Sequence, residues 1–126
     1  MENRENILSD LRSIGIIDET TSEAEAFQNQ TLRPILKKQN SLFMAIFSHY
    51  FTQHKNIFHP LCIAEKEQYL QTIFRKDAQF VGFLTGTIVG MFSLSEYQTY
   101  TQNTQELNKR MRKMLQERIR SQLGDF

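Results

Sequence analysis

Apolar residues recur along most of this chain at intervals of three and four, the spacing that places side chains on one face of an α-helix. The pattern is clearest over residues 34–54. Its large apolar side chains occupy about half of the helix circumference, an arc wide enough to need more than one neighbouring helix as cover. We therefore predict a central helix here, with its inner positions at Ile35, Leu36, Leu42, Phe43, Ile46, Phe47, Tyr50 and Phe51.

The same period predicts further helices, and no segment shows the convincing alternation of a β-strand. The predicted fold is all-α, a compact antiparallel bundle of five to six helices. Its 126 residues form one domain, with residues 1–20 as a peripheral N-terminal helix and residues 22–123 as the main bundle. The additional helices are expected over residues 7–14, 22–32, 61–75, 77–89 and 94–122, the last interrupted near Asn103.

Several residues predict where helices begin and end. Ser22 and Ser93 are each followed three residues later by Glu, the spacing of a capping box. Gly90 is expected to end the helix over residues 77–89 in a left-handed conformation. Pro34 allows two interpretations, because proline either opens a new helix at its first turn or kinks a continuous one.

Composition narrows the class of protein. Hydrophobic residues make up 40% of the chain and include ten Phe and four Tyr, enough for a folded core. The single cysteine, Cys62, excludes a disulfide framework and is expected to be a small buried thiol. The first residues do not resemble a secretory signal, and the apolar stretch over residues 80–92 is shorter than the roughly 20 residues of a membrane span. We expect a cytoplasmic protein that does not enter a membrane.

The charges are unevenly distributed, although the formal net charge is only +1. Residues 1–32 carry an excess of acidic groups, and residues 106–120 carry an excess of basic groups. The leading hypothesis is a non-enzymatic interaction module that docks an anionic partner, either an acidic protein or a nucleic acid, on a basic helix face. The alternative for this face is a solvated surface partly neutralised by the acidic N-terminal part. The candidate partner-binding residues are Arg33, Lys37, Lys38, Lys109, Arg110 and Lys113.

Gly82, Gly86 and Gly90 recur at every fourth position and place small residues along one helical face. Such a face lets the backbone of another helix approach closely. We expect Gly82 and Gly86 to serve a helix contact, either an internal crossing or the contact between two copies in a homodimer.

No recognised catalytic motif is present, and no cofactor or metal is predicted. The three histidines are five residues apart, so a helix does not place two of them on one face as metal ligands. The alternative function is a small enzyme of unknown reaction with a pocket between helices. Its nearest convergent polar groups are His54, Gln39 and Tyr50, which share a face of the predicted helix.

Residues 27–40, FQNQTLRPILKKQN, and residues 107–111, LNKRM, resemble a family of short bacterial proteins that often carry the automatic name "glyoxalase". The resemblance covers most of the chain from Phe27 onward and implies no catalytic residue. Metal-dependent glyoxalases have a strand-rich fold with His and Glu metal ligands. The helical pattern and the histidine spacing of this chain differ from both features, so lyase activity is not expected.

Overall fold

A computed structural model describes residues 19–53, 58 and 60–126, and these residues contain helices and no strand. The all-α prediction is therefore confirmed. The described residues hold six helices when α2 (Glu19–Phe27), the π-helical segment η1 (Gln28–Leu32) and α3 (Arg33–Lys38) are counted as one helix, because these three elements form a continuous rod. The predicted helix over residues 7–14 lies outside the described residues. The elements are α2 (Glu19–Phe27), η1 (Gln28–Leu32), α3 (Arg33–Lys38), α4 (Asn40–Gln53), α6 (Ile63–Lys76), α7 (Ala78–Val89), α8 (Leu94–Gln102), α9 (Thr104–Arg120) and the 3₁₀ turn η2 (Leu123–Asp125).

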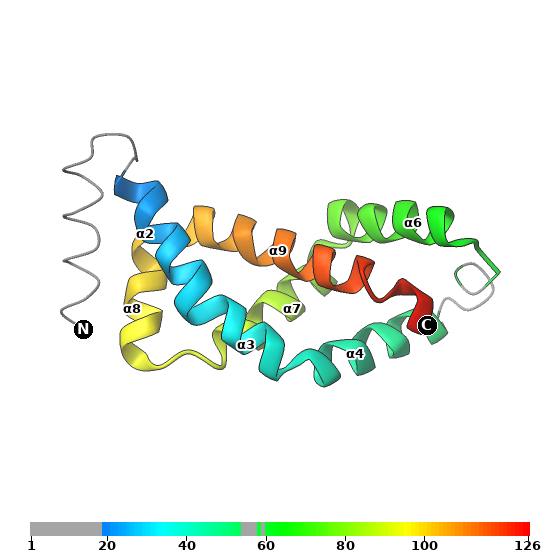
Figure 1. Ribbon diagram of the computed structural model, residues 1–126, viewed down its shortest axis with the longest axis horizontal. Helices are drawn as coiled ribbons and strands as arrows, with labels where there is room; N and C mark the ends of the chain where they lie inside the picture. Colours follow the sequence, from blue (N-terminus) through cyan, green and yellow to red (C-terminus); the bar gives the residue numbers. More distant parts are fainter. Residues whose placement is uncertain (1–18, 54–57, 59) are drawn as a thin grey trace.

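The helices run back and forth along the long axis of the molecule (Figure 1). The rod of α2, η1 and α3 continues into α4, α6 and α7 return in the opposite direction, and α8 lies across one end. From that end α9 runs back along the bundle and packs against α6, α7, α8 and η1. The arrangement is an antiparallel bundle in which α9 touches most of the other elements.

Aromatic rings fill the part of the core beneath α4. Phe43, Phe47 and Phe51 recur at intervals of four, which places them on one face of α4, and all three are fully buried. The Phe47 ring stacks on Phe74 of α6 at a centroid distance of 6.2 Å and meets Phe80 of α7 edge to face at 5.4 Å. These contacts tie α4 to both returning helices. The inner face of α9 completes the core with Leu107, Met111, Leu115 and Ile119.

Pro34 lies in a continuous helical rod that changes its winding just before the proline. Residues 28–32 form a π-helical turn, and the N–H of Arg33 donates to the carbonyl oxygen of Gln28, five residues back. Proline has no N–H, and its ring crowds the carbonyl four residues earlier, so a wider preceding turn relieves the conflict. The interpretation of one continuous helix through Pro34 is therefore the observed one, with the irregularity in the turn before the proline. The rod already begins at Glu19, so the predicted start at Ser22 is wrong.

The predicted helix over residues 34–54 is divided at Gln39, whose φ of −98° and ψ of 15° separate α3 from α4. Helical hydrogen bonds still cross this point, because the N–H of Gln39 donates to Ile35 and the N–H of Phe43 donates to Gln39. The inward face continues across it, because Leu36 and Phe43, seven residues apart, are both buried. Leu42, predicted to face inward, is 45% exposed.

At the junction between α7 and α8, the predicted capping box at Ser93 is confirmed and the predicted left-handed cap at Gly90 is contradicted. The main-chain N–H of Ser93 donates to the Glu96 carboxylate at 2.7 Å, and the N–H of Glu96 donates to the Ser93 hydroxyl at 3.2 Å. This is the predicted capping box. Gly90, however, has φ −61° and ψ −15°, so the prediction of a left-handed cap is wrong. The predicted interruption at Asn103 is confirmed, since this residue separates α8 from α9 with φ −140°.

Cys62 lies at the N-cap of α6 with its side chain exposed, which contradicts the prediction of a buried thiol. Its main-chain N–H donates to the Glu65 carboxylate at 3.1 Å and lowers the pKa of that carboxyl group. The first residues of α6 lie away from the core, since Ile63, Ala64 and Glu65 are exposed as well, and Cys62 is therefore at the surface.

Candidate partner-binding surface

Helix α3 forms a short basic ridge. Its six residues, RPILKK, include three cations and no acidic residue. Leu36 is 1% exposed and fixes the inward side of the turn, so Arg33, Lys37 and Lys38 are left on the outward side, where all three are exposed. A groove lies on each side of the ridge. The sequence therefore positions these cations through a single buried leucine.

The groove between α3 and α8, which we call the α3–α8 groove, has a volume of about 620 Å³. Its apolar lining comes from Pro34, Ile35 and Met91. The amide nitrogen of Gln39 lies 3.8 Å from the sulfur of Met91 and links the α7–α8 turn to the end of α3. The full lining is Gln30, Thr31, Pro34, Ile35, Lys37, Lys38, Met91 and Glu96.

The α3–α8 groove is electrostatically one-sided. Its one carboxylate, Glu96, accepts hydrogen bonds from the main-chain N–H of Ser93 at 2.7 Å and from the Thr31 hydroxyl at 3.5 Å. Lys37 and Lys38 are exposed and form no ion pair within the part of the chain that the structure describes. The cations are therefore available to an anionic ligand, while the carboxylate is occupied at the start of α8.

On its other side, α3 borders a smaller and more polar groove against α9, with a volume of about 380 Å³. Arg33 lines it together with Arg118 and Glu117. The floor is closed by reciprocal amide hydrogen bonds at 3.1 Å between Asn40 and Gln122, and the Arg118 guanidinium donates to Asn40 at 3.3 Å. These bonds tie the end of the chain to the α3–α4 junction.

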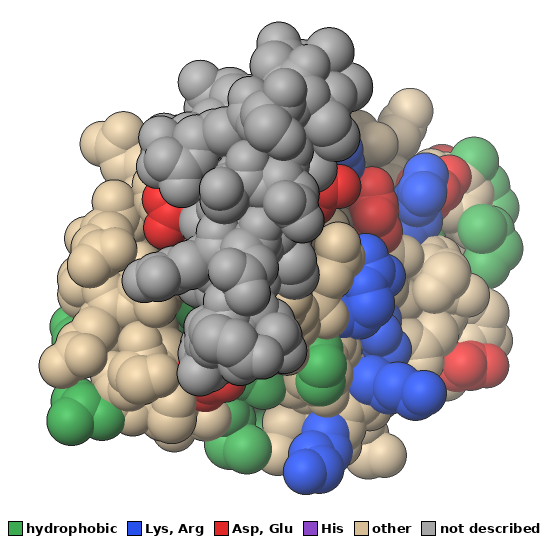
Figure 2. All heavy atoms as spheres, turned by 60° about the vertical axis from the view of Figure 1, so that its left-hand side comes forward, with side chains coloured by type: hydrophobic (Ala, Val, Ile, Leu, Met, Phe, Trp, Pro, Cys, Tyr) green, Lys and Arg blue, Asp and Glu red, His purple; other side chains and the backbone are tan. Residues whose placement is uncertain are grey.

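The three predicted residues on α9 differ in their environment. Arg110 is only 20% exposed, and its guanidinium donates to Glu106 at 2.8 Å and to Gln28 at 2.7 Å. It therefore fastens α9 to η1, and its prediction as a free docking group is wrong. Lys109 and Lys113 are exposed, with Lys109 lining a polar depression at the α8–α9 bend. Figure 2 shows Lys and Arg side chains gathered on one part of the surface, with acidic ones at its margin.

The predicted internal crossing at the glycines is wrong. A Cβ atom added at Gly82 or Gly86 would meet nothing within 4 Å other than the helix's own neighbouring residues. Both glycines are exposed on α7. Gly82 borders a groove of about 480 Å³ between α7 and α9, where Arg75 and Arg112 also lie. Sequence analysis did not single out these two arginines, because they belong to different helices and share no local pattern.

Of the three residues proposed for an enzyme pocket, the two that the structure describes, Gln39 and Tyr50, do not converge. Gln39 contacts Met91, whereas the Tyr50 hydroxyl donates to the carboxylate of Asp77 at 2.7 Å. Burial, followed by the hydrogen bond to Asp77, raises the pKa of Tyr50, so its hydroxyl stays protonated at neutral pH. Eleven residues separate Gln39 from Tyr50, which is roughly 16 Å of helix. His54 lies outside the described residues, and those described contain no group of three metal-ligating side chains.

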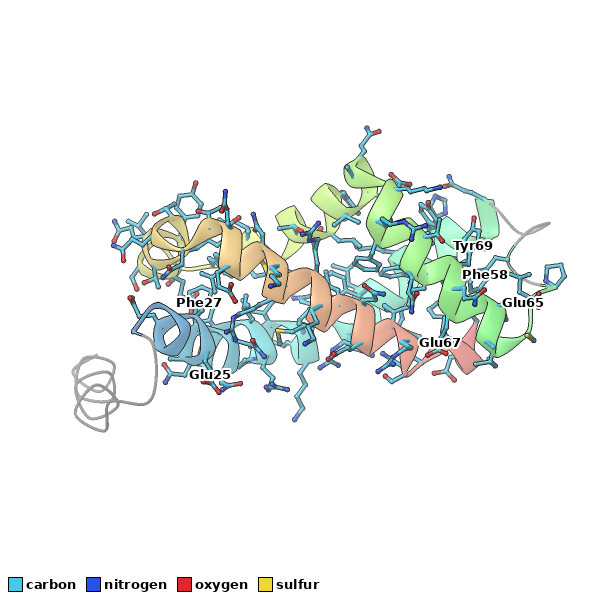
Figure 3. All side chains as sticks on the ribbon, turned by 90° about the horizontal axis from the view of Figure 1, so that it is seen from above. Glu25, Phe27, Phe58, Glu65, Glu67 and Tyr69 are labelled. Carbon is cyan, nitrogen blue, oxygen red and sulfur yellow. The ribbon has the colours of Figure 1, made fainter. Side chains whose placement is uncertain are left out.

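Lys66 of α6 is 8% exposed and is the one buried charged residue in the described part of the chain. Its ammonium group lies 5.1 Å from the centre of the Phe58 ring and 3.5 Å from the main-chain oxygen of Phe126. Phe58 and Tyr69 lie near each other at this end of the bundle, with ring centroids 5.6 Å apart (Figure 3). Attraction between the ammonium and the ring face compensates part of the burial of the charge.

Comparisons with protein-family models, with curated proteins and with solved structures found no match to this chain. Within the described residues, no helix is both long enough and apolar enough to cross a membrane. The surfaces described above are therefore the indication of function that this chain offers.

Proposed function

We propose that this protein is a non-enzymatic interaction module that binds an acidic segment of a partner protein in the α3–α8 groove. The observation that supports this function is the pairing of two exposed, unpaired cations, Lys37 and Lys38, with an apolar groove lining. An acidic segment supplies charge for the lysines, and an apolar side chain of that segment fits against Pro34 and Met91. Electrostatic complementarity of this kind favours association and fixes orientation.

An acidic protein segment is favoured over a nucleic acid. Phosphate contacts dominate nucleic-acid affinity, and proteins that depend on them carry a large excess of cations. This chain has a formal net charge of +1 and an acidic N-terminal part. Helix α8, which contributes Glu96 to the groove, also exposes apolar side chains, with Leu94 76% and Tyr97 47% exposed. Apolar surface next to cations suits an amphipathic peptide better than a phosphate backbone.

The proposed module acts in the cytoplasm. The exposed thiol of Cys62 supports this location, because an accessible cysteine remains reduced in that compartment and is prone to oxidation outside it.

A binding assay with defined probes tests the function. The probe is a fluorescent helical peptide rich in Glu with Leu at every fourth position, measured by anisotropy at low salt. Charge reversal by Lys37→Glu with Lys38→Glu should weaken its binding by about tenfold or more. The matched control is Arg75→Glu with Lys76→Glu, an adjacent basic pair that also ends a helix, and it should leave binding nearly unchanged.

Two further probes separate the alternatives. Replacing the Leu residues of the peptide by Gly should weaken binding, because the groove then loses its apolar contact. Preferential binding of single-stranded oligothymidine would instead assign the basic surface to nucleic acid. Equal losses in the two double variants, or no peptide binding by the unmodified protein, would overturn the proposal.

A further inference from the structure

We infer that a second copy of this chain covers the outer face of α4 and α7, so that the protein forms a homodimer through a surface separate from the α3–α8 groove. The first observation is a complete lack of charged residues. The 14 residues of α4 and the 12 residues of α7 include no Asp, Glu, Lys or Arg. Helix faces that meet only water normally carry charged side chains.

The α4–α7 face is exposed and apolar. Phe83 is 57% exposed, and Leu42 is 45% exposed. Between the two helices lies a groove of about 480 Å³, lined among others by Ala45, Ile46 and Phe80. An exposed aromatic ring next to an apolar groove is an arrangement that typically marks a protein contact.

The tight packing beneath this face makes it a rigid platform. The Tyr50 ring stacks on Phe80 at a centroid distance of 4.2 Å, and the Tyr50 hydroxyl is bonded to Asp77 at the start of α7. Phe80 also meets the buried ring of Phe47. A preformed surface loses little conformational entropy when it is covered by a partner.

An exposed ring at the edge of a groove on one uncharged face favours a second copy over a different partner. A two-fold axis sets the same patch against itself, so that residue i of one copy meets residue j of the other and a projecting side chain faces the patch's own groove. The basic surfaces of α3 and α9 would repel their own copies, whereas the α4–α7 face would not. In a two-fold pair, Phe83 of each copy can enter the groove of the other. Gly86 lies one turn from Phe83 with open space above it, so a partner helix can come close.

Analytical ultracentrifugation over a range of concentrations tests this inference. The unmodified protein should reach twice the 14.9 kDa of one chain and should dissociate on dilution. Phe83→Glu places an unpaired carboxylate in the apolar groove of the other copy, so we expect the dimer dissociation constant to rise by about tenfold or more. Leu94→Glu is the matched control, because Leu94 is an even more exposed apolar residue on α8, and it should leave the dimer intact.

Gly86→Ala separates association from folding. The added methyl comes within 4 Å of no described residue outside its own stretch of α7, and alanine is the better helix former, so the monomer should be equally or more resistant to unfolding. The same methyl occupies the space expected for the partner helix, so dimerisation should weaken. A protein that stays monomeric at every concentration, or a dimer that tolerates both Phe83→Glu and Gly86→Ala, would overturn the inference. Neither result depends on Lys37 and Lys38.

Discussion

Helices α9 and α7 pack against each other and use opposite surface chemistries. The 17 residues of α9 include Glu106, Glu117 and six basic side chains, while the 12 residues of α7 include no charge. Both helices bury one apolar stripe, so the core does not require this difference. The difference lies entirely on the outward faces. We conclude that the exposed surface of α9 suits water and charged ligands, and that of α7 suits an apolar partner.

The grooves beside α3 and α4 show the same contrast between a charged and an uncharged surface. The α3–α8 groove has two lysines on its rim, whereas the groove between α4 and α7 has none and is lined mainly by apolar side chains. Gln39 lies between the two helices. Leu36 and Phe43, seven residues apart, are both buried, so α3 and α4 share one inward face and differ in the side chains that they expose.

The largest expected loss of stability comes from a substitution in the aromatic core beneath the α4–α7 face. Phe47→Ala removes a fully buried ring that contacts Phe74 and Phe80, and it should lower the free energy of unfolding by about 3–5 kcal/mol. Lys113→Ala, on the exposed face of α9, should change it by no more than about 0.5 kcal/mol. Urea denaturation at low protein concentration measures both. Similar losses in the two variants would contradict the assignment of the core.

A smaller loss of stability is expected from removing the hydrogen bond between Tyr50 of α4 and Asp77 at the start of α7. Tyr50→Phe removes the hydroxyl that donates to Asp77 and should cost about 1.5–3 kcal/mol at neutral pH, because a carboxylate loses a donor. Phe80 still stacks on the new ring, so the fold should persist.

The same variant has a predicted pH dependence. The pKa of Tyr50 is raised in the folded protein, so the unfolded chain loses its proton first when the pH rises above 10. The contribution of Tyr50 is therefore complete below pH 10 and declines above it. Stability measured between neutral and alkaline pH should fall less steeply for Tyr50→Phe, and the gap between the two proteins should narrow. A gap that widens with pH would contradict this assignment.

The smallest expected change in stability concerns the start of α8, the helix that connects α7 to α9. Ser93→Ala removes the hydroxyl that caps α8 and should destabilise the protein by about 1 kcal/mol. Ser95→Ala, in the first turn of the same helix and exposed, is the control and should stay within about 0.5 kcal/mol of the unmodified protein. Thermal unfolding of the two variants makes the comparison. Equal melting temperatures would show that the capping box does not stabilise this helix start.

The local pattern was sufficient for most helices because helical period and capping act within a few residues. The Ser93 capping box and the break at Asn103 were both predicted from neighbours in the sequence. The predictions for Gly90 and Cys62 failed for a related reason. Glycine permits a left-handed end without requiring one, and a cysteine's burial depends on whether its helix start lies against the core.

The sequence indicated which residues are basic, but it did not indicate which of them lie together on an exposed surface. The basic pattern indicated Lys37 and Lys38 correctly as exposed cations, and it also indicated Arg110, which α9 uses internally against Glu106 and Gln28. Lys66 shows the opposite case, since nothing nearby in the sequence indicates that a charged residue lies beneath Phe58. Partners far along the chain contribute to both outcomes, Gln28 to the position of Arg110 and Phe126 to that of Lys66.

The sequence by itself determined the all-α class, the helices of the main bundle and the charge of each helix, because these depend on interactions within a few residues. Only the tertiary structure decided the π-helical turn before Pro34, the open space over Gly82 and Gly86, and the grooves on either side of α3. These features arise where helices far apart in the chain meet. Packing between them depends on the relative position of whole faces, which no local period contains.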